Sequence, residues 1–105
     1  MYARVTTLMG SPAKIDEGIR SMQEDILPAA KKIPGFVGAI EFVDRKSGKT
    51  IVATLWESEQ ARQASEDRAN QLRASASTAA GASTAPTVER YEVVLMSGIE
   101  VPAHA

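Results

Sequence analysis

The tripeptide Trp56-Glu57-Ser58 marks a point where a strand ends and a helix begins, and this junction constrains the fold more than any other feature of the chain. The residues before it, 51–56, alternate with the two-residue period of a strand and are rich in β-branched side chains. Ser58 can cap the free amides of a helix that begins at Glu59. With this boundary fixed, the chain predicts the order strand, helix, strand, strand, helix, strand.

The first part of the chain predicts a strand, a helix and a second strand. Residues 2–8 and 36–43 both have the alternation typical of strands. Between them, apolar side chains recur every three or four positions over 12–33, which places them in one stripe along a helix. We expect Ser11 to cap this helix and Pro28 to bend it, because proline lacks an amide and crowds the preceding turn.

The second part of the chain predicts a hairpin, a helix and a last strand. A polar connection over 44–48 joins the second strand to a third over 49–56. The helix predicted over 59–77 has mostly alanine at its inner positions, so we expect a cavity between it and the sheet. Alanine, serine, threonine and glycine dominate residues 75–86, which predicts a mobile loop or a frayed helix end. A fourth strand is expected over 87–96.

This order predicts an α+β protein with a ferredoxin-like βαββαβ fold, in which two helices cover one face of a four-stranded antiparallel sheet. We expect one domain over 1–96 and a C-terminal tail over 97–105. Both sheet faces carry large apolar side chains, yet two helices cover only one face. At about 25 cal/mol per Å² of apolar surface, leaving the other face in water would forgo several kcal/mol. The sequence therefore predicts a homodimer that pairs through this face, a dimeric α+β barrel.

Composition disfavours several classes of protein. The formal net charge is only -1, so no basic field is available for nucleic acid or an anionic membrane. The chain has no cysteine, which excludes disulfides, thiolate catalysis and cysteine-ligated metals. No long apolar run or leader is present, so the cytoplasm is the expected location. An RNA-recognition module shares the element order, but strand 49–56 lacks exposed aromatics flanked by basic residues.

Two short motifs resemble a known family. Pro34-Gly35-Phe36-Val37-Gly38 at the first helix-to-strand junction and Trp56-Glu57-Ser58 before the second helix are similar to the antibiotic biosynthesis monooxygenase domain of the dimeric α+β barrel superfamily. The resemblance covers residues 2–96. It implies a pocket in each subunit between helices and sheet. Characterised relatives there oxygenate phenols, anthrones or quinols with molecular oxygen, without flavin or metal, while another branch degrades haem.

The haem-degrading branch is disfavoured by the residues of the second predicted helix. The resemblance implies an axial histidine late in that helix and a further tryptophan earlier in it. The helix instead contains Ser65, Arg68, Leu72 and Ser75, and the only histidine of the chain is His104, in the tail. Haem iron without a proximal ligand would be held weakly, so the expectation is no cofactor and no metal site.

An aromatic substrate needs an apolar slot and a few polar groups that help to remove its phenolic proton. The candidates that combine these properties are Trp56, Tyr91, Arg4, Asn70, Arg68, Phe42 and Leu72, with Glu66 as a further polar group. No catalytic residue is assigned. Each candidate also has a simpler interpretation: the aromatics as core or interface residues, Arg4 as a cross-strand ion pair, and the helix charges Glu59, Arg62, Glu66 and Asp67 as a solvated face.

The resulting hypothesis is a cofactor-independent monooxygenase that oxidises a small aromatic phenol, quinol or anthrone with molecular oxygen. The alternative is a non-catalytic ligand-binding or scaffold homodimer of the same fold, favoured by the missing histidine and by the lack of an obvious acid–base pair. The partners expected are a second copy of the chain and a small aromatic ligand, with no role for nucleic acid or membrane.

Overall fold

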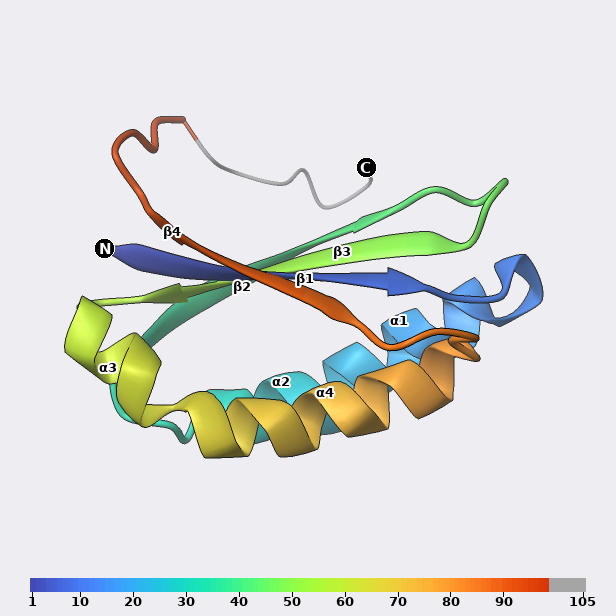
Figure 1. Cartoon of the computed structure of the whole chain (residues 1–105), viewed down its shortest axis with the longest axis horizontal. Coiled ribbons are helices and arrows are strands. Elements are labelled where there is room, and N and C mark those ends of the chain that lie inside the picture. The colour runs from blue at the N-terminus through green and yellow to red at the C-terminus, as the bar shows by residue number, and fades with distance from the viewer. Residues whose placement is uncertain (99–105) are drawn as a thin grey trace.

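The computed structural model describes residues 1–98, and it places all helices of that range on one face of a single four-stranded sheet (Figure 1). The strands are antiparallel and lie in the order β2-β3-β1-β4. Their bounds are β1 Tyr2–Met9, β2 Phe36–Val43, β3 Lys49–Trp56 and β4 Thr87–Glu92. This arrangement confirms the predicted α+β, ferredoxin-like fold. Most of the predicted C-terminal tail, residues 99–105 including His104, lies outside the described part.

The strand register decides which side chains meet the helices. In β1, Tyr2 lies opposite Trp56 of β3, and Arg4 lies opposite Arg90 of β4. The β2–β3 register shifts between Phe36 and Gly38, so the alternation of β2 changes at this irregularity. Side chains that share the helix-covered face are Arg4, Thr6, Leu8, Phe36, Ala39, Glu41, Val52, Thr54, Trp56 and Arg90.

The first helical segment is not one continuous α-helix. It consists of η1 Pro12–Lys14, α1 Ile15–Ser21, a π-helical turn η2 Met22–Ile26 and α2 Leu27–Ala30. The irregularity expected at Pro28 is present as this π turn, in which the Leu27 amide donates to the Met22 carbonyl five residues back. The prediction that Ser11 caps the segment is wrong, because its side chain makes no capping hydrogen bond.

The second helical segment is interrupted at Ser65, which divides it into α3 Glu59–Ala64 and α4 Glu66–Ala80. The predicted cap is confirmed, since Ser58 Oγ accepts from the Ala61 amide at 3.0 Å. The end predicted near residue 77 is wrong: the alanine-rich stretch stays helical until Gly81, whose φ of +65° ends the helix in the left-handed region. High helix propensity of alanine explains this extension.

The last strand is shorter than predicted. Ordered pairing with β1 ends at Glu92, although the Val93 amide still donates to the Met1 carbonyl at 2.9 Å. Beyond that point Val94 and Leu95 are 85% and 83% exposed. The strand predicted as far as residue 96 is therefore wrong, since the pairing of β4 with β1 ends at the pair Tyr2 and Glu92.

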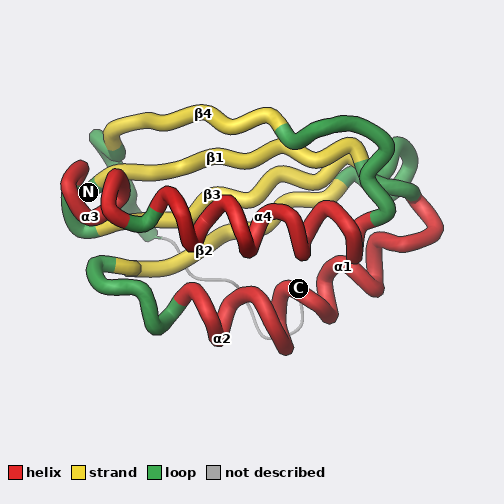
Figure 2. The backbone as a smooth tube through the Cα atoms, turned by 60° about the horizontal axis from the view of Figure 1, so that its bottom comes forward, coloured by secondary structure: helices red, strands yellow, loops and turns green. Residues whose placement is uncertain are grey.

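The core lies between the two helical segments and the sheet, which form two layers (Figure 2). Met22, Ile26 and Val52 are its buried centre, and Leu27, Leu72 and Ala76 pack against them. The first helical segment contributes large side chains from η2 and α2, whereas α4 contributes mainly small ones. No helix within residues 1–98 combines the length and apolar character needed to cross a membrane.

Candidate functional site

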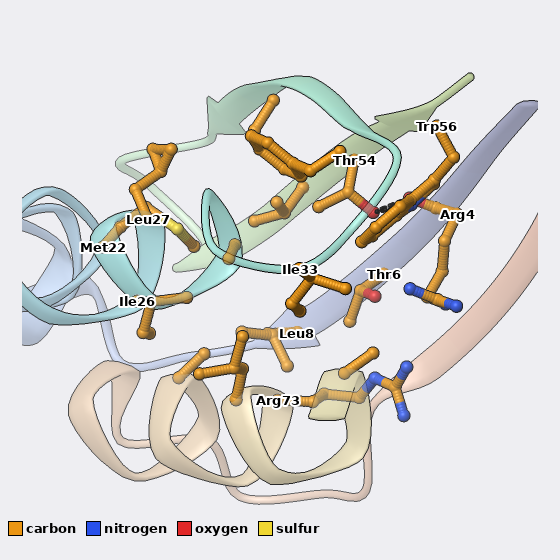
Figure 3. A pocket seen from close by; sticks show the side chains of 17 residues that line it. Arg4, Thr6, Leu8, Met22, Ile26, Leu27, Ile33, Thr54, Trp56 and Arg73 are labelled. Atoms are coloured by element: carbon orange, nitrogen blue, oxygen red, sulfur yellow. Dashed lines mark hydrogen bonds between the residues drawn. The ribbon is translucent and has the colours of Figure 1, made fainter. Parts of the chain in front are cut away.

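A partly open, mainly apolar cavity of about 70 Å³ lies between the sheet and the helical layer (Figure 3). This is where the alanine-rich helix predicted one, and Ala69, Leu72 and Ala76 of α4 line it. A bound water requires about 10–15 Å³, and an engineered cavity of about 150 Å³ binds benzene. The cavity therefore has room for part of one aromatic ring, and a whole ring would have to extend through the opening or displace side chains.

Trp56 forms one wall of this cavity and is only 1% exposed. Its ring meets Phe36 edge to face, with centroids 5.5 Å apart. Its Nε1 donates to Thr54 Oγ1 at 3.1 Å, so the indole has a hydrogen-bond partner on its own strand. Because the ring is fixed on both sides, it offers a preformed aromatic surface to a ligand.

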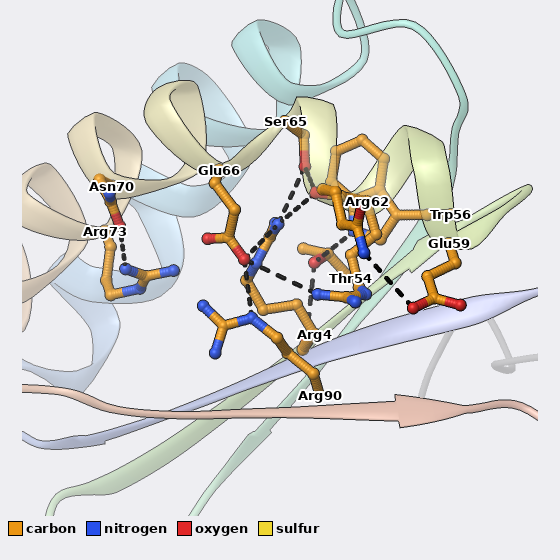
Figure 4. A network of polar contacts seen from close by, with 11 residues as sticks. Arg4, Thr54, Trp56, Glu59, Arg62, Ser65, Glu66, Asn70, Arg73 and Arg90 are labelled. Atoms are coloured by element: carbon orange, nitrogen blue, oxygen red, sulfur yellow. Dashed lines mark hydrogen bonds and ion pairs between the residues drawn. The ribbon is translucent and has the colours of Figure 1, made fainter.

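Arg4 is buried beside that indole, with 2% of its surface exposed and its guanidinium carbon 5.5 Å from the ring centroid. Its Nη2 donates to the Arg62 carbonyl at 2.7 Å and to Ser65 Oγ at 2.9 Å (Figure 4). The interruption between α3 and α4 supplies both acceptors. Burial lowers the pKa of Arg4, and the nearby carboxylate of Glu66, 3.3 Å away, opposes this shift.

Glu66 joins several arginines at this end of the cavity. Its Oε1 accepts from Arg90 Nε at 2.7 Å and lies 3.7 Å from Arg62 Nη1, in addition to its contact with Arg4. The hydrogen bond from Arg90 holds the pKa of Glu66 below its usual range. Burial lowers the pKa of Arg73, and the carboxylate of Glu66 opposes this shift. We refer to Arg4, Arg62, Arg73 and Arg90 as the arginine cluster.

The structure brings together three of the seven sequence candidates: Trp56, Arg4 and Leu72 line the cavity. Phe42 and Tyr91 lie on the opposite sheet face, where they are 55% and 50% exposed, because their strand positions alternate away from the helices. The Tyr91 hydroxyl donates to Glu89 there, at 2.6 Å. The expectation that these two rings face the same slot is thus corrected.

Arg68 and Asn70 are also outside the cavity wall, although both belong to α4. Arg68 is exposed, and Asn70 Oδ1 accepts a hydrogen bond from Arg73 at the border of a separate, more open groove. Glu66 contacts the cluster without lining the cavity. The small inner residues of this helix form only a weak apolar stripe, so the direction of its polar side chains could not be predicted reliably from the sequence.

Sequence reasoning missed Arg73 and placed Arg62 on a solvated face, yet Arg62 is 8% exposed and Arg73 lines the cavity. A usable signal was present. Arg62, Glu66, Ala69 and Arg73 follow one another by four, three and four residues, which places them on one side of a continuous helix. Oppositely charged residues at this helical spacing, on the side of the helix that faces Arg4 of the sheet, indicate a buried ionic cluster rather than a solvent-exposed face.

The donor groups of the site do not suit haem or a metal ion. Among residues 1–98, no three histidine, cysteine, aspartate or glutamate side chains gather into a possible metal-binding group. The seventeen residues lining the cavity include no histidine, cysteine or tyrosine that could serve as an axial haem ligand.

No family model matches the chain. The uncharacterized protein Rv2558 of Mycobacterium tuberculosis is 34% identical over 96 residues, which cover 91% of this chain and 40% of that protein. The uncharacterized protein Rv2557 of the same organism is 32% identical over 96 residues, which cover 91% of this chain and 42% of that protein. This chain therefore spans about 40% of the length of the curated relatives that it matches.

Solved structures share the whole fold. The monooxygenase ActVA-Orf6 of Streptomyces coelicolor, solved with nanaomycin D, has a TM-score of 0.69 at 21% identity, covering 97% of this chain and 92% of that one. SnoaB of Streptomyces nogalater, a cofactor-independent oxygenase, has a TM-score of 0.65 at 14% identity, with 93% and 97% covered. The haem-degrader MhuD of Mycobacterium tuberculosis, solved with two haems, has a TM-score of 0.72 at 23% identity, with 93% and 100% covered. The resemblance to the antibiotic biosynthesis monooxygenase proteins is thus confirmed at the level of the fold.

Proposed function

We propose that this chain, which has the fold of the antibiotic biosynthesis monooxygenase proteins, is a cofactor-independent monooxygenase of a small aromatic phenol, quinol or anthrone. The observation that carries the proposal is an apolar cavity with a fixed indole on one wall and two guanidinium groups at one end, the buried one of Arg4 and the half-buried one of Arg73. Two fold neighbours are described as a monooxygenase and a cofactor-independent oxygenase, which supports the same reaction class.

The cationic end of the cavity would promote the first chemical requirement, ionisation of the substrate. An electron-rich ring reacts with oxygen far more readily as its anion, and nearby guanidinium groups stabilise a phenolate or enolate relative to its neutral form. Trp56 and the aliphatic wall would bind the ring and exclude water. In this role Arg4 acts electrostatically, since its Nη2 already donates to Arg62 and Ser65.

The overall reaction needs no further reductant. The substrate loses two hydrogen atoms and gains one oxygen atom, as a carbonyl in a phenol or anthrone and as a ring hydroxyl in a quinol, while the second oxygen atom of O₂ leaves as water with those two hydrogens. Phenol would give a para-quinone in this way, and anthrone would give anthraquinone. The substrate itself supplies all four electrons that reduce O₂.

A second candidate is a non-catalytic ligand-binding dimer. The cavity wall, as far as residues 1–98 form it, holds no carboxylate or imidazole that could accept the substrate proton. On this alternative the same cavity would bind an aromatic ligand without turnover.

Oxygen consumption separates the two functions. We expect oxygen uptake with 1-naphthol, 1,4-naphthohydroquinone or anthrone to exceed autoxidation in a sample with heat-denatured protein, with quinone formed in equal amount. Leu72→Trp should abolish the excess by filling the cavity, whereas Arg68→Trp adds a similar ring at an exposed position of α4 and should retain it. Binding of these compounds without any excess uptake would favour the non-catalytic alternative.

A homodimer through the open sheet face is the proposed assembly. Phe42 and Tyr91 are exposed on that face, beside Val5, Ile40 and Leu55, and no helix of the described range covers them. A two-fold axis would bury the same patch of both copies in one self-complementary contact. Burial of several such side chains is worth several kcal/mol at about 25 cal/mol per Å².

A further inference from the structure

Two donor atoms of the half-buried Arg73 side chain, at the end of the cavity, have no hydrogen-bond acceptor. Arg73 lines the cavity, and its Nη1 donates to Asn70 Oδ1. Its Nε and Nη2 are enclosed by protein, yet no atom of residues 1–98 accepts a hydrogen bond from either of them. Unpaired donors of a buried cation are costly, since they lose their hydration and gain nothing in return.

The surrounding charges do not neutralise this group. The arginine cluster contributes four guanidinium cations, and the carboxylate in contact with them is that of Glu66. Arg4, Arg62 and Arg90 already share its Oε1, within 2.7 to 3.7 Å, while Arg73 forms no ion pair with it at this range. The cluster therefore has four cations and one carboxylate in contact with them. This excess of positive charge would attract an anionic ligand.

Arg73 is one of the residues that line the cavity, so a ligand that lies there would be next to its guanidinium group, and it would reach Nε and Nη2 once the protein atoms that enclose them shift. Figure 3 shows the guanidinium groups of Arg73 and Arg4 at the same end, beyond Thr6 and on the side of Trp56. The Nε–H and Nη2–H bonds of a guanidinium are nearly parallel and are spaced to meet two oxygens of one carboxylate. A phenolate has a single oxygen and would leave one of these donors unpaired.

We infer that the cavity binds a small aromatic carboxylic acid, whose ring packs against Trp56 and Leu72 and whose carboxylate bridges Nε and Nη2 of Arg73. The inference rests on the proposed function for its site, and it adds the class of substrate: a phenol or quinol that also carries a carboxylate. Other phenols would bind more weakly, because they leave the Arg73 edge desolvated and unpaired.

A matched pair of probes tests this inference by equilibrium binding. Benzoate and benzamide have the same ring and nearly the same shape, but only benzoate carries a charge. Trp56 is the single tryptophan and lines the cavity, so its fluorescence reports occupancy directly, and calorimetry gives an independent affinity. We expect benzoate to bind at least about tenfold more tightly than benzamide, which corresponds to one charge-assisted hydrogen-bonded pair.

Variants of Arg73 identify the group responsible. Arg73→Met should reduce the preference for benzoate to about onefold, and Arg73→Lys should retain only part of it because the parallel donors are lost. Arg68→Met removes a charge from an exposed position of the same helix and should keep the full preference. If Arg73→Met does not fold, as judged by circular dichroism, Arg73→Gln replaces it with a neutral side chain that keeps polar atoms.

The outcomes separate this inference from the proposed function. Equal affinity for the two probes, binding of neither probe, or a preference that survives in both Arg73→Met and Arg73→Gln would overturn the inference. Benzoate binding through Arg73 without oxygen uptake from 3-hydroxybenzoate, whose para position is free, would support the inference and contradict the oxygenase. Oxygen uptake from an uncharged quinol, together with equal affinity for benzoate and benzamide, would support the oxygenase and contradict the inference.

Discussion

The two faces of the sheet differ in an unexpected way: the covered face buries a charged side chain, and the open face exposes large apolar ones. The helix-covered face buries Arg4, at 2% exposed, and carries the hydroxyls of Thr6 and Thr54. The open face carries Phe42, at 55% exposed, and Leu55. Charge is tolerated under the helices because the interruption between α3 and α4 supplies acceptors and Glu66 supplies an opposite charge. The candidate site therefore lies on the helix-covered face of the sheet, and the proposed dimer interface lies on the open face.

The largest expected effect concerns the open face. Phe42→Asp should dissociate the proposed dimer, which light scattering would record as a fall from 2 × 11.2 = 22.4 kDa to 11.2 kDa. Each Phe side chain buried is worth about 1.5–3 kcal/mol, and the dimer buries two, so the dissociation constant should rise by about 100-fold or more.

The control for this change is Gln63→Asp, at an exposed position of α3 on the other side of the sheet. It should leave the mass unchanged. A wild-type protein that already scatters as a single copy at micromolar concentration would contradict the dimer outright.

A smaller effect is expected on the covered face. Arg4→Met keeps a long side chain over Trp56 but removes the donors to the Arg62 carbonyl and to Ser65 Oγ. We expect the free energy of unfolding in urea to fall by about 2–3 kcal/mol, the value of hydrogen bonds from a charged donor to buried acceptors. Arg68→Met should stay within about 0.5 kcal/mol. Increased stability of Arg4→Met would instead show that desolvation of the guanidinium outweighs its contacts.

The smallest effects are in the pH dependence, where two glutamates of the covered side should act with opposite sign. The pKa of Glu66 is lowered by its bond from Arg90, so its contribution is complete above the unfolded value of about 4.3 and is lost as pH falls through the folded value. Burial raises the pKa of Glu41, so stability falls as pH rises from the unfolded to the folded value.

Urea midpoints between pH 2 and 7 test both signs. Glu66→Gln should flatten the loss of stability at acid pH, and Glu41→Gln should raise the midpoint at pH 7 while leaving the acid limb unchanged. If the two variants shift the profile in the same direction, the assignment of a paired and an unpaired carboxylate is wrong.

Local features of the sequence predicted most of the fold. The period-two runs gave three strands nearly to the residue, and Ser58 capped the helix that it was expected to cap. Errors arose where local signals were weak or ambiguous. The alanine-rich stretch over 75–80 has low complexity but high helix propensity, and it is helical. The last strand was predicted too long, because its length depends on where β1 begins.

The candidate site was only partly predictable for a related reason. Trp56 and Arg4 could be placed from strand alternation, which fixes a face once the neighbouring strand is known. Arg73 could not, because its importance depends on the enclosure of two of its donors by other elements. Tyr91 and Phe42 have aromatic side chains suited to a pocket, but their positions along the strands place them on the open face of the sheet.

The sequence by itself determined the order of the elements, the single antiparallel sheet and the presence of small side chains on one helix, since each follows from periodicity, caps and propensity within a short window. Only the tertiary structure decided that Ser65 interrupts this helix, that Arg4 is buried under the interruption, and that Arg73 lines the cavity with two of its donors enclosed and unpaired. Hydrogen bonds and desolvation depend on distances between residues about 60 positions apart, such as Arg4 and Ser65, and no local pattern encodes those distances.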